Sequence, residues 1–342
     1  MISACEVSGD GIAARIAPAL RECCEEPILA GSCGSAMRRA GVECLARAED
    51  FSHVGWVSVL RDLPRLAWKT WRYFRKVEHF APKVAVLVDA PGLHGPLAQR
   101  LRRRGVEMVW VAPPQLWAWK DRQPNVLRGM RVHPMHRFEV GPLRRAQADA
   151  HWLGFPGGAP MTRAAQPDLL ALLPGSRPGW RSLHRTLFLE AVLALDLPLR
   201  PVFVHPHPPS SMELGIECLS PDQALPRAAL ALSLPGTGAL ELARLGVPTL
   251  LAARPRRLDA FFAHQRLDPG FKGLPNRILG VEVFPERFST DLTPKELAGC
   301  LVGVWERRAE TRERLESFEG LLWAQDAERR IAGSIAEIVH GG

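Results

Sequence analysis

The sequence contains no apolar run near the roughly 20 residues that a membrane-spanning helix requires. Because no secretion signal precedes its first motif, we expect the protein to remain in the cytoplasm. Its seven cysteines include no C-x-x-C pair, which favours reduced thiols over a disulfide framework or a zinc site. The pairs His133/His136 and His205/His207 come without an obvious set of carboxylate or cysteine ligands, so we expect no metal site.

Length and composition indicate a globular protein of about two domains. The chain has 342 residues, of which 46% are hydrophobic and 23% charged. Glycine, proline, arginine and alanine are frequent from residue 142 to 162, and residues 154–158 are the most hinge-like part. We therefore expect an N-terminal domain over residues 1–155 and a C-terminal domain over 156–325. A last helix over 326–342 is expected to return to the N-terminal domain.

Positive charge is concentrated in the N-terminal half. From Arg61 to Arg145 there are 18 Lys and Arg residues against 6 Asp and Glu, a net charge of +12, whereas the whole chain carries +8 and the remainder therefore −4. An anionic membrane, a phosphorylated substrate or a nucleic acid would each complement this surplus. A nucleic-acid partner is not expected, because charge is the sole argument for it and no recognition module is present.

The segment from Val57 to Lys76 has the spacing of an amphipathic helix, with Pro64 expected in its first turn. With Trp68 among the cations, the pattern is typical of a helix that lies in a membrane interface. A surface helix packed on its own sheet is the alternative, and we favour membrane contact. The basic residues are Arg61, Arg65, Lys69, Arg72 and Lys76, and the apolar face comprises Leu60, Leu63, Ala67, Trp71 and Phe74.

Two turns in the second half have the form of phosphate-binding turns. The apolar strand Leu169–Leu173 runs into a Pro174–Arg177 turn and then a helix. Such a turn directs backbone amides, the Ser176 hydroxyl and the Arg177 guanidinium to the carboxyl end of a strand, where open α/β sheets bind anions. An ordinary strand-to-helix loop remains the alternative.

The second turn follows a predicted strand at residues 228–232. Gly236, Thr237 and Gly238 open a helix whose first amides suit a diphosphate, and Glu241, one turn later, suits a ribose diol. The spacing is not the dinucleotide G-x-G-x-x-G, but two such turns in one domain point to one phosphate ligand. Asn276 adds an amide from a third loop.

In the N-terminal half, polar residues follow two predicted strands. Ser8 and Asp10 follow the first, with Asp10 a candidate N-cap of the next helix. Asp89 ends the strand at residues 83–89 and is a candidate base or a partner for a substrate hydroxyl; its alternative role is to cap the helix predicted over residues 95–104. His94 is a second candidate, because an unperturbed imidazole titrates near neutrality.

A rigid aromatic loop, residues 113–120, follows the strand at Glu107–Val111. Trp117 and Trp119 in this loop could hold a sugar or an acyl chain, or they could wedge the loop onto the core. Both readings place the loop at the same edge as Asp89.

Together these motifs resemble lipid-A-disaccharide synthase, a family of glycosyltransferases with the two-domain GT-B architecture. The matches occur in family order over nearly the whole chain. The family's AGEASGD, IDAPDFN and SPSVWAWR correspond to ACEVSGD (4–10), VDAPGLH (88–94) and APPQLWAWK (112–120); LALLPGSR is intact at 170–177, SGTAALE reads PGTGALE (235–241), and LPN is retained at 274–276.

The resemblance implies an α/β fold of two Rossmann-like domains whose parallel sheets face a central cleft. It implies a hexosyltransferase that moves diacylglucosamine from UDP to diacylglucosamine 1-phosphate with inversion and without a metal or other cofactor. On this reading Ser176, Arg177, Gly236, Thr237 and Gly238 meet the diphosphate. Glu241 binds the ribose, Asn276 helps to place the donor, and Ser8 and Asp89 lie near the transfer point.

The resemblance also assigns the tryptophan-bearing basic helix to an anionic inner-membrane surface, where the protein would associate peripherally and admit acyl chains. A homodimer is left open. Two departures matter: the second acid of the family's DAPD motif is Gly92, and a family histidine is Phe155. Either Asp89 or His94 removes the acceptor proton, or the chain is a diverged nucleotide-sugar-binding homologue with altered or lost activity.

Overall fold

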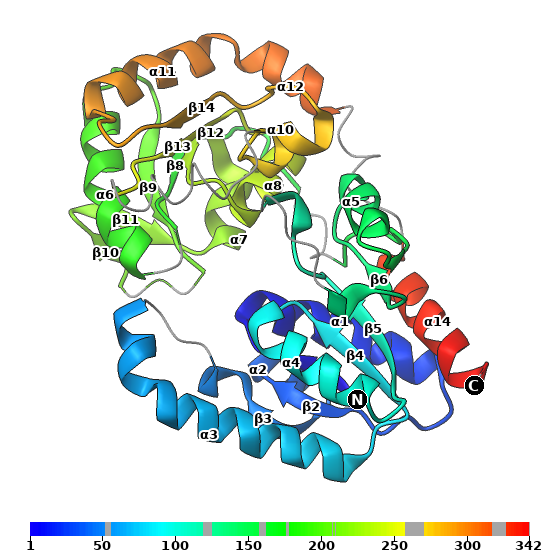
Figure 1. The fold of residues 1–342 in the computed structure, drawn as a ribbon. Coiled ribbons are helices and arrows are strands. Elements are labelled where there is room, and N and C mark those ends of the chain that lie inside the picture. The colour runs from blue at the N-terminus through cyan, green and yellow to red at the C-terminus, as the bar shows by residue number, and fades with distance from the viewer. Residues whose placement is uncertain are drawn as a thin grey trace. The chain divides into compact units, whose positions relative to one another are not determined.

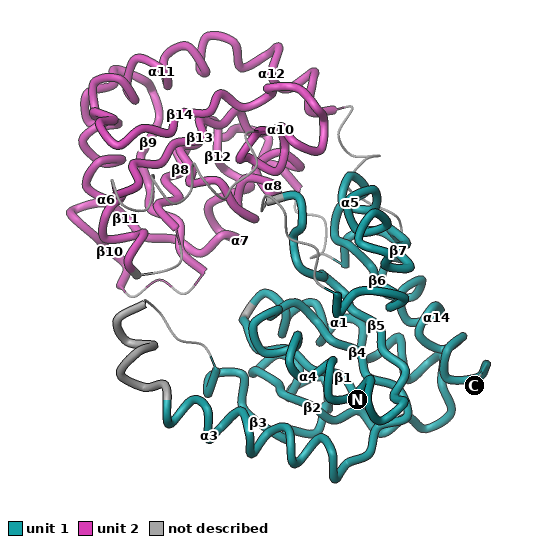
Figure 2. Tube along the Cα trace, in the orientation of Figure 1, with its two compact units in different colours: residues 1–157, 322–342 teal, residues 158–321 magenta. Residues whose placement is uncertain are grey.

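The computed structural model describes residues 1–51, 56–118, 125–156, 162–175, 178–206, 208, 210–256, 270–316 and 326–341 (Figure 1). The chain divides into two compact units: unit 1 contains residues 1–157 and 322–342, and unit 2 contains residues 158–321 (Figure 2). The C-terminal helix therefore belongs to unit 1. Among the described helices, none combines the length and the apolarity needed to cross a bilayer.

Unit 1 is a parallel α/β unit. Its five-stranded sheet has the order β1-β4-β5-β6-β7, and β2 and β3 form a separate parallel pair. The strands are β1 (Ile2–Ala4), β2 (Ala30–Cys33), β3 (Glu43–Arg47), β4 (Val84–Val88), β5 (Glu107–Val111), β6 (Arg131–His133) and β7 (Asp149–Ala150). The helices are α1 (Val7–Cys23), α2 (Ser35–Arg39), α3 (Trp56–Phe80), α4 (Pro91–Arg102), α5 (Val140–Arg145) and α14 (Ala327–His340).

Helices cover both faces of this sheet, because successive strand residues point to opposite sides. Val86 and Val88 of β4 pack in one cluster with α1 and with Ile331 of α14. Ala85 and Leu87 pack in the other cluster, which contains residues of α3 and α4.

Unit 2 repeats the architecture around a seven-stranded sheet of order β10-β11-β9-β8-β12-β13-β14, in which only β10 is antiparallel. The strands are β8 (Leu169–Leu173), β9 (Arg200–Val204), β10 (Met212–Glu213), β11 (Ile216–Leu219), β12 (Ala228–Ser233), β13 (Thr249–Ala253) and β14 (Glu286–Phe288). The helices are α6 (Pro178–Leu193), α7 (Pro221–Ala224), α8 (Thr237–Arg244), α10 (Leu274–Leu279), α11 (Pro294–Glu306) and α12 (Arg308–Glu316). The predicted α/β class with parallel sheets is confirmed.

Asp10 caps a different helix from the one predicted. Helix α1 begins at Val7, so Asp10 already lies in its first turn. Its buried carboxylate accepts hydrogen bonds from the amides of Gly34 (2.8 Å), Ala36 (2.8 Å) and Met37 (3.1 Å) at the start of α2. A Cβ at Gly34 would lie 2.5 Å from the Asp10 Oδ2 atom, so this position requires glycine. Asp10 thus joins two helices of unit 1.

Helix α3 differs from the prediction in its start and in its buried face. It begins at Trp56, so Pro64 lies in its interior, not in its first turn. Tyr73, Phe74 and Val77 are buried in unit 1, whereas Trp68 and Trp71 are each 53% exposed. Trp71 therefore does not share the buried face with Phe74. The outer face of α3 is aromatic as well as basic.

Removing the Asp10 carboxylate is expected to destabilise unit 1. Asp10→Ala leaves three amides at the start of α2 without their partner, which should cost about 2–3 kcal/mol. Urea unfolding followed on the transition of unit 1 measures the loss. Glu25→Ala, which removes an exposed carboxylate from the same unit, is the control. Equal stability of the two variants would contradict this role.

Candidate functional site

Asp89 follows β4 in a backbone conformation that few residues adopt. Its φ is +55°, and that of Ala90 is +49°. The Asp89 amide donates to the Val111 carbonyl (3.0 Å), and its own carbonyl accepts from His94 Nδ1 (2.8 Å) and Trp110 Nε1 (3.2 Å). These three bonds hold the strained bend, and strain of this kind is concentrated at functional sites.

The Asp89 carboxylate reaches the start of α1. The exposed Ser8 hydroxyl donates to Asp89 Oδ2 at 3.2 Å. Gly9 allows the approach, because a Cβ there would lie 3.3 Å from the Asp89 Cβ and from the Val88 carbonyl oxygen. Helix α4 is preceded by Ala90 and has no side-chain cap, so Asp89 does not serve the alternative capping role. The structure brings the predicted pair Ser8 and Asp89 together.

The structure does not support His94 as the base that the sequence predicts as a second candidate. Its ring is fully buried, and burial lowers its pKa to about 4. Nδ1 must carry the proton, because it faces the Asp89 carbonyl, and Nε2 lies 2.9 Å from the Ser3 hydroxyl. An imidazole without access to solvent and with both nitrogens engaged cannot collect a proton from a substrate. Its contacts instead fix the Asp89 bend.

A buried chain of hydrogen bonds, the His94 relay, continues from His94 to α3. The Ser32 amide donates to the Tyr73 hydroxyl oxygen (3.2 Å), which leaves the Tyr73 proton for Ser3 Oγ (2.7 Å). Ser3 then donates to His94, and His94 donates to Asp89. The donor and the acceptor of each hydrogen bond in this relay are fixed, because the relay starts at the Ser32 amide, which can only donate, and ends at the Asp89 carbonyl, which can only accept. One clue to this relay is visible along the chain, because Ser3 is a polar residue inside an apolar strand.

Trp117 is tied to the interior of unit 1. Its Nε1 donates to Glu139 Oε1 at 2.7 Å, and the His136 amide donates to Glu139 Oε2 at 2.9 Å. Burial raises the pKa of Glu139 to about 7. The His136 ring stacks on Phe138 and on Phe155, with centroids 5.6 and 6.1 Å apart.

For Trp117 these contacts favour the wedge alternative, and Phe155 fills a place in the same aromatic stack. Glu139, which the sequence analysis did not single out, is the residue that anchors the loop. Trp119 lies outside the described residues.

The two predicted donor turns follow neighbouring strands of unit 2. Strands β8 and β12 are parallel, with Leu173 opposite Ser233, so their carboxyl ends meet at one edge of the sheet. The Leu234 amide donates to the Leu173 carbonyl at 3.0 Å. A Cβ at Gly175, where φ is +98°, would lie 2.8 Å from the Leu234 side chain, and one at Gly238 would lie 2.8 Å from that of Leu173. Glycine at both positions lets the two turns pack against each other.

The residues of these turns are described in part. Ser176 and Arg177 lie outside the described residues. Gly236 precedes α8, and Thr237 and Gly238 form its first turn, with Gly236 and Thr237 exposed. Glu241, one turn further, accepts a hydrogen bond from Arg244 Nη1 at 3.0 Å. The start of α8 therefore presents backbone amides at the edge where β8 and β12 end.

The structure does not support Asn276 as a residue that binds the sugar donor. It is fully buried, and its Nδ2 donates to the Phe284 carbonyl (2.7 Å) and to Glu286 Oε1 (2.8 Å). Its Oδ1 accepts from the amides of Val283 (2.9 Å) and Phe284 (2.8 Å). All four of its hydrogen-bonding positions are used within unit 2. Asn276 holds the α10 segment in place and has no group left for a ligand.

The outer face of α3 pairs indoles with guanidinium groups. The Arg72 guanidinium lies 5.1 Å from the Trp68 ring centroid, and that of Arg75 lies 6.0 Å from the Trp71 centroid. Arg65 is exposed, whereas Lys69 is held in an ion pair with Asp50 at 2.6 Å. Arg61 is part of α3, but its side chain is not among those that the structure describes.

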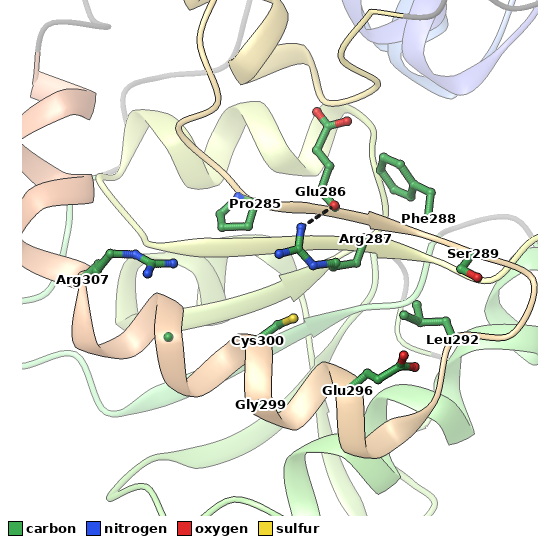
Figure 3. Close-up of a pocket in the computed structure, with 11 residues that line it drawn as sticks. Pro285, Glu286, Arg287, Phe288, Ser289, Leu292, Glu296, Gly299, Cys300 and Arg307 are labelled. Atoms are coloured by element: carbon green, nitrogen blue, oxygen red, sulfur yellow. Dashed lines mark hydrogen bonds between the residues drawn. The ribbon is translucent and has the colours of Figure 1, made fainter.

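A cavity of about 660 Å³ in unit 2 lies elsewhere, between the edge strand β14 and α11 (Figure 3). It is lined by Arg287, Cys300 and Arg307 among others, and none of the predicted donor residues that the structure describes lines it. The Glu286 side chain points away from α11 and serves Asn276 and the Lys272 and Gly273 amides instead (Figure 3). Across the described residues, no three His, Cys, Asp or Glu side chains form a group that could hold a metal.

Comparison with solved structures defines the class. The chain resembles the glycotransferase of kitacinnamycin, with a TM-score of 0.60, 14% identity and 98% of each chain covered. It also resembles the structure described as "S. aureus MnaA-UDP co-structure", with a TM-score of 0.67, 12% identity, and 99% and 96% of the two chains covered. At these identities the likeness concerns the fold alone. The protein has the GT-B fold of two Rossmann-like units.

Comparison of sequences gives the family. The family model described as lipid-A-disaccharide synthetase matches residues 1–196. The chain is 30% identical to the lipid-A-disaccharide synthase of Thiobacillus denitrificans, over 97% of each protein. It is 28% identical to that of Solibacter usitatus, over all of this chain and 97% of the relative. The chain belongs to the lipid-A-disaccharide synthase family of glycosyltransferases.

The buried His94 predicts part of the acid sensitivity of unit 1. A folded pKa of about 4, lowered from 6.5, means that the His94 contribution to stability is present above pH 6.5 and is lost as the pH falls towards 4. His94→Gln should reduce the slope of unfolding free energy against pH in this window by up to about 1.4 kcal/mol per pH unit. Urea unfolding at several pH values measures this, with the exposed His79→Gln as control. Identical slopes would contradict the burial of a neutral ring.

Proposed function

We propose that the protein transfers 2,3-diacylglucosamine from UDP to 2,3-diacylglucosamine 1-phosphate, giving lipid A disaccharide 1-phosphate and UDP. Membership of the family supports the reaction class. The observation that carries the proposal is the register of β8 and β12, because it makes two phosphate-type turns neighbours at one sheet edge. A Ser8–Asp89 pair in unit 1 adds a carboxylate of the kind that proton removal needs.

On the donor side, the proposal gives unit 2 the UDP. The first amides of α8 and the Arg177 guanidinium would meet the charge that grows on the diphosphate as its bond to the sugar breaks. Glu241 would accept hydrogen bonds from the ribose diol. Arg244, which donates to Glu241 at 3.0 Å, holds that carboxylate in one orientation. Asn276 supports this region only through the α10 segment.

On the acceptor side, the proposal gives Asp89 the role of base. Its carboxylate would take the proton of an acceptor hydroxyl while the oxygen forms a bond to the anomeric carbon, and UDP leaves with the electron pair of the broken bond. Attack from the face opposite UDP inverts that carbon. The Ser8 hydroxyl at 3.2 Å would orient the carboxylate oxygen that it contacts. With His94 neutral and buried, Asp89 is the remaining one of the two predicted bases.

Asp89→Asn is expected to abolish most transfer while UDP still binds. The amide keeps the size of the carboxylate but cannot accept the proton, so kcat should fall by about 10²–10⁴. Release of UDP from UDP-diacylglucosamine and the acylated phosphosugar in detergent gives kcat, and UDP-induced thermal stabilisation gives binding. Asp222→Asn, in α7 of unit 2, is the control. Unchanged kcat in Asp89→Asn would rule out this base.

A substitution at Gly92 distinguishes an active enzyme from the alternative, a homologue that binds nucleotide sugars without turnover. A Cβ at Gly92 would meet nothing within 4 Å, so Gly92→Asp restores the family's second acid without a clash. If the natural chain binds UDP but releases none from the substrates, and Gly92→Asp gains activity, the alternative holds. Release of UDP by the natural chain supports the transferase.

We further propose that the outer face of α3 rests on an anionic lipid surface. Trp68 and Trp71, each 53% exposed, would insert their indoles at the interface, while Arg65, Arg72 and Arg75 meet lipid phosphates. The pairing of each indole with a guanidinium gives the face both properties at once. Such docking would keep the protein peripheral, next to its acylated substrates.

Replacing both exposed indoles is expected to weaken vesicle binding. Trp68→Ala with Trp71→Ala removes apolar area that the interface would bury, and affinity for anionic vesicles should fall about tenfold or more. Co-sedimentation with phosphatidylglycerol vesicles measures this, with phosphatidylcholine vesicles for comparison. Leu193→Ala, which alters a 66% exposed side chain in unit 2, is the control. Equal vesicle binding by the double tryptophan variant and the Leu193→Ala control would contradict membrane contact through this face of α3.

A further inference from the structure

The cavity between β14 and α11 has the size and the lining of a site for a small organic molecule. Its volume of about 660 Å³ falls within the roughly 300–1,000 Å³ that such sites enclose. Phe288 and Leu292 contribute apolar side chains to its walls, and Arg287 and Arg307 contribute positive charge. A molecule that complements these walls has an apolar body and an anionic group.

The two guanidinium groups point toward one another along this cavity. Arg287 comes from β14 and Arg307 from the residue that follows α11 (Figure 3). Arg287 Nη1 donates to the Glu286 carbonyl oxygen at 2.8 Å, which restricts the direction of its side chain. Within the described part of the chain, neither guanidinium forms an ion pair, and that of Arg307 donates no hydrogen bond.

The carboxylates of the residues that line the cavity are engaged by other groups. The Glu286 side chain points away from α11 and accepts hydrogen bonds from Asn276 and from two backbone amides (Figure 3). Glu296 Oε2 accepts from the Thr293 amide and hydroxyl, both at 2.8 Å, at the start of α11. Neither carboxylate pairs with the two arginines, so their charge is left for a ligand.

Two glycines of α11 keep the cavity open. Gly299 and Gly303 line it and lie four residues apart, on one face of the helix. Glycine is unfavourable inside a helix, and close packing is a usual reason for its presence there. A Cβ at Gly299 would meet nothing within 4 Å, and one at Gly303 would lie 3.7 Å from Arg307 Nη2. Close packing therefore does not require these glycines, and larger side chains would occupy the cavity.

We propose that this cavity binds a small phosphate ester with an apolar body, its phosphate held between Arg287 and Arg307. Two guanidinium groups offer two positive charges and paired N–H donors, which suit a phosphate dianion better than a single carboxylate. Phe288 and Leu292 lie on the other side of Arg287 from Arg307 and would contact the apolar body (Figure 3). A water-soluble ester and a lipid phosphate share this chemistry.

Protection of the Cys300 thiol tests the site in the full-length protein. Cys300 lines the same cavity and is partly exposed. The probe is 1-naphthyl phosphate, which has both an apolar body and a phosphate. It should slow alkylation of Cys300 by iodoacetamide several-fold, as measured by mass spectrometry of the peptides, whereas 1-naphthol at equal concentration should not. Alkylation of the exposed Cys44 in unit 1 should not change.

Three variants test which groups bind. Arg287→Gln and Arg307→Gln should each raise the concentration for half-protection about tenfold, because each removes charged N–H donors. Gly303→Leu should abolish protection by filling the cavity without lowering the melting temperature, since leucine favours a helix. Lys295→Gln, which removes an exposed cation of α11 outside the cavity, is the control. Absence of protection in the natural chain, or equal protection in the control and both arginine variants, would overturn the proposal.

Two further probes test the apolar body and the source of the phosphate. Inorganic phosphate should protect Cys300 only at much higher concentration than 1-naphthyl phosphate, and equal protection would contradict a role for the apolar walls. Dihexanoyl phosphatidic acid, dissolved as monomers, represents a lipid. Half-protection at a lower concentration of this lipid than of 1-naphthyl phosphate assigns the site to a lipid phosphate, and the reverse order assigns it to a water-soluble ester.

Discussion

The bend at Asp89 depends on hydrogen bonds to its own backbone, and the one from His94 Nδ1 to the Asp89 carbonyl connects it to the interior of unit 1. Two consecutive residues with positive φ cost about 1–3 kcal/mol each, so the bend persists only where neighbours hold it. The His94 relay supplies this hold and draws on β1, β2 and α3 through Ser3, Ser32 and Tyr73. The exposed Ser8–Asp89 pair is therefore positioned by groups that are buried inside unit 1.

Unit 2 reaches its arrangement by a different constraint, the register of two parallel strands. Leu173 opposite Ser233 fixes where β8 and β12 end, and close packing of Gly175 and Gly238 against leucine side chains brings the following turns together. Here the backbone of regular elements does the positioning, and side-chain hydrogen bonds are secondary.

The sequence could predict what depends on neighbours along the chain. Apolar runs followed by glycine and proline located the strands and turns of both units, and motif order located the family. It could not predict Asn276 or His94, because the groups that engage them, Glu286 and Ser3, are brought near only by the fold. Trp71 and Phe74 lie about 60° apart around a helix, so their spacing predicts that they share one face. In the structure the boundary of the buried face passes between them, because Phe74 is buried and Trp71 is exposed.

Helix α3 joins the outer surface of unit 1 to the Asp89 bend. Trp71 faces outward, while Tyr73, two residues on, donates its proton into the His94 relay. Because a helix is stiff over so short a distance, a rotation of α3 that moved its indoles would also move the Tyr73 hydroxyl. The buried relay opposes such a rotation, since it would leave the Ser3 and Ser32 groups unsatisfied. The exposed aromatic face is thus carried on a helix that the His94 relay holds in place.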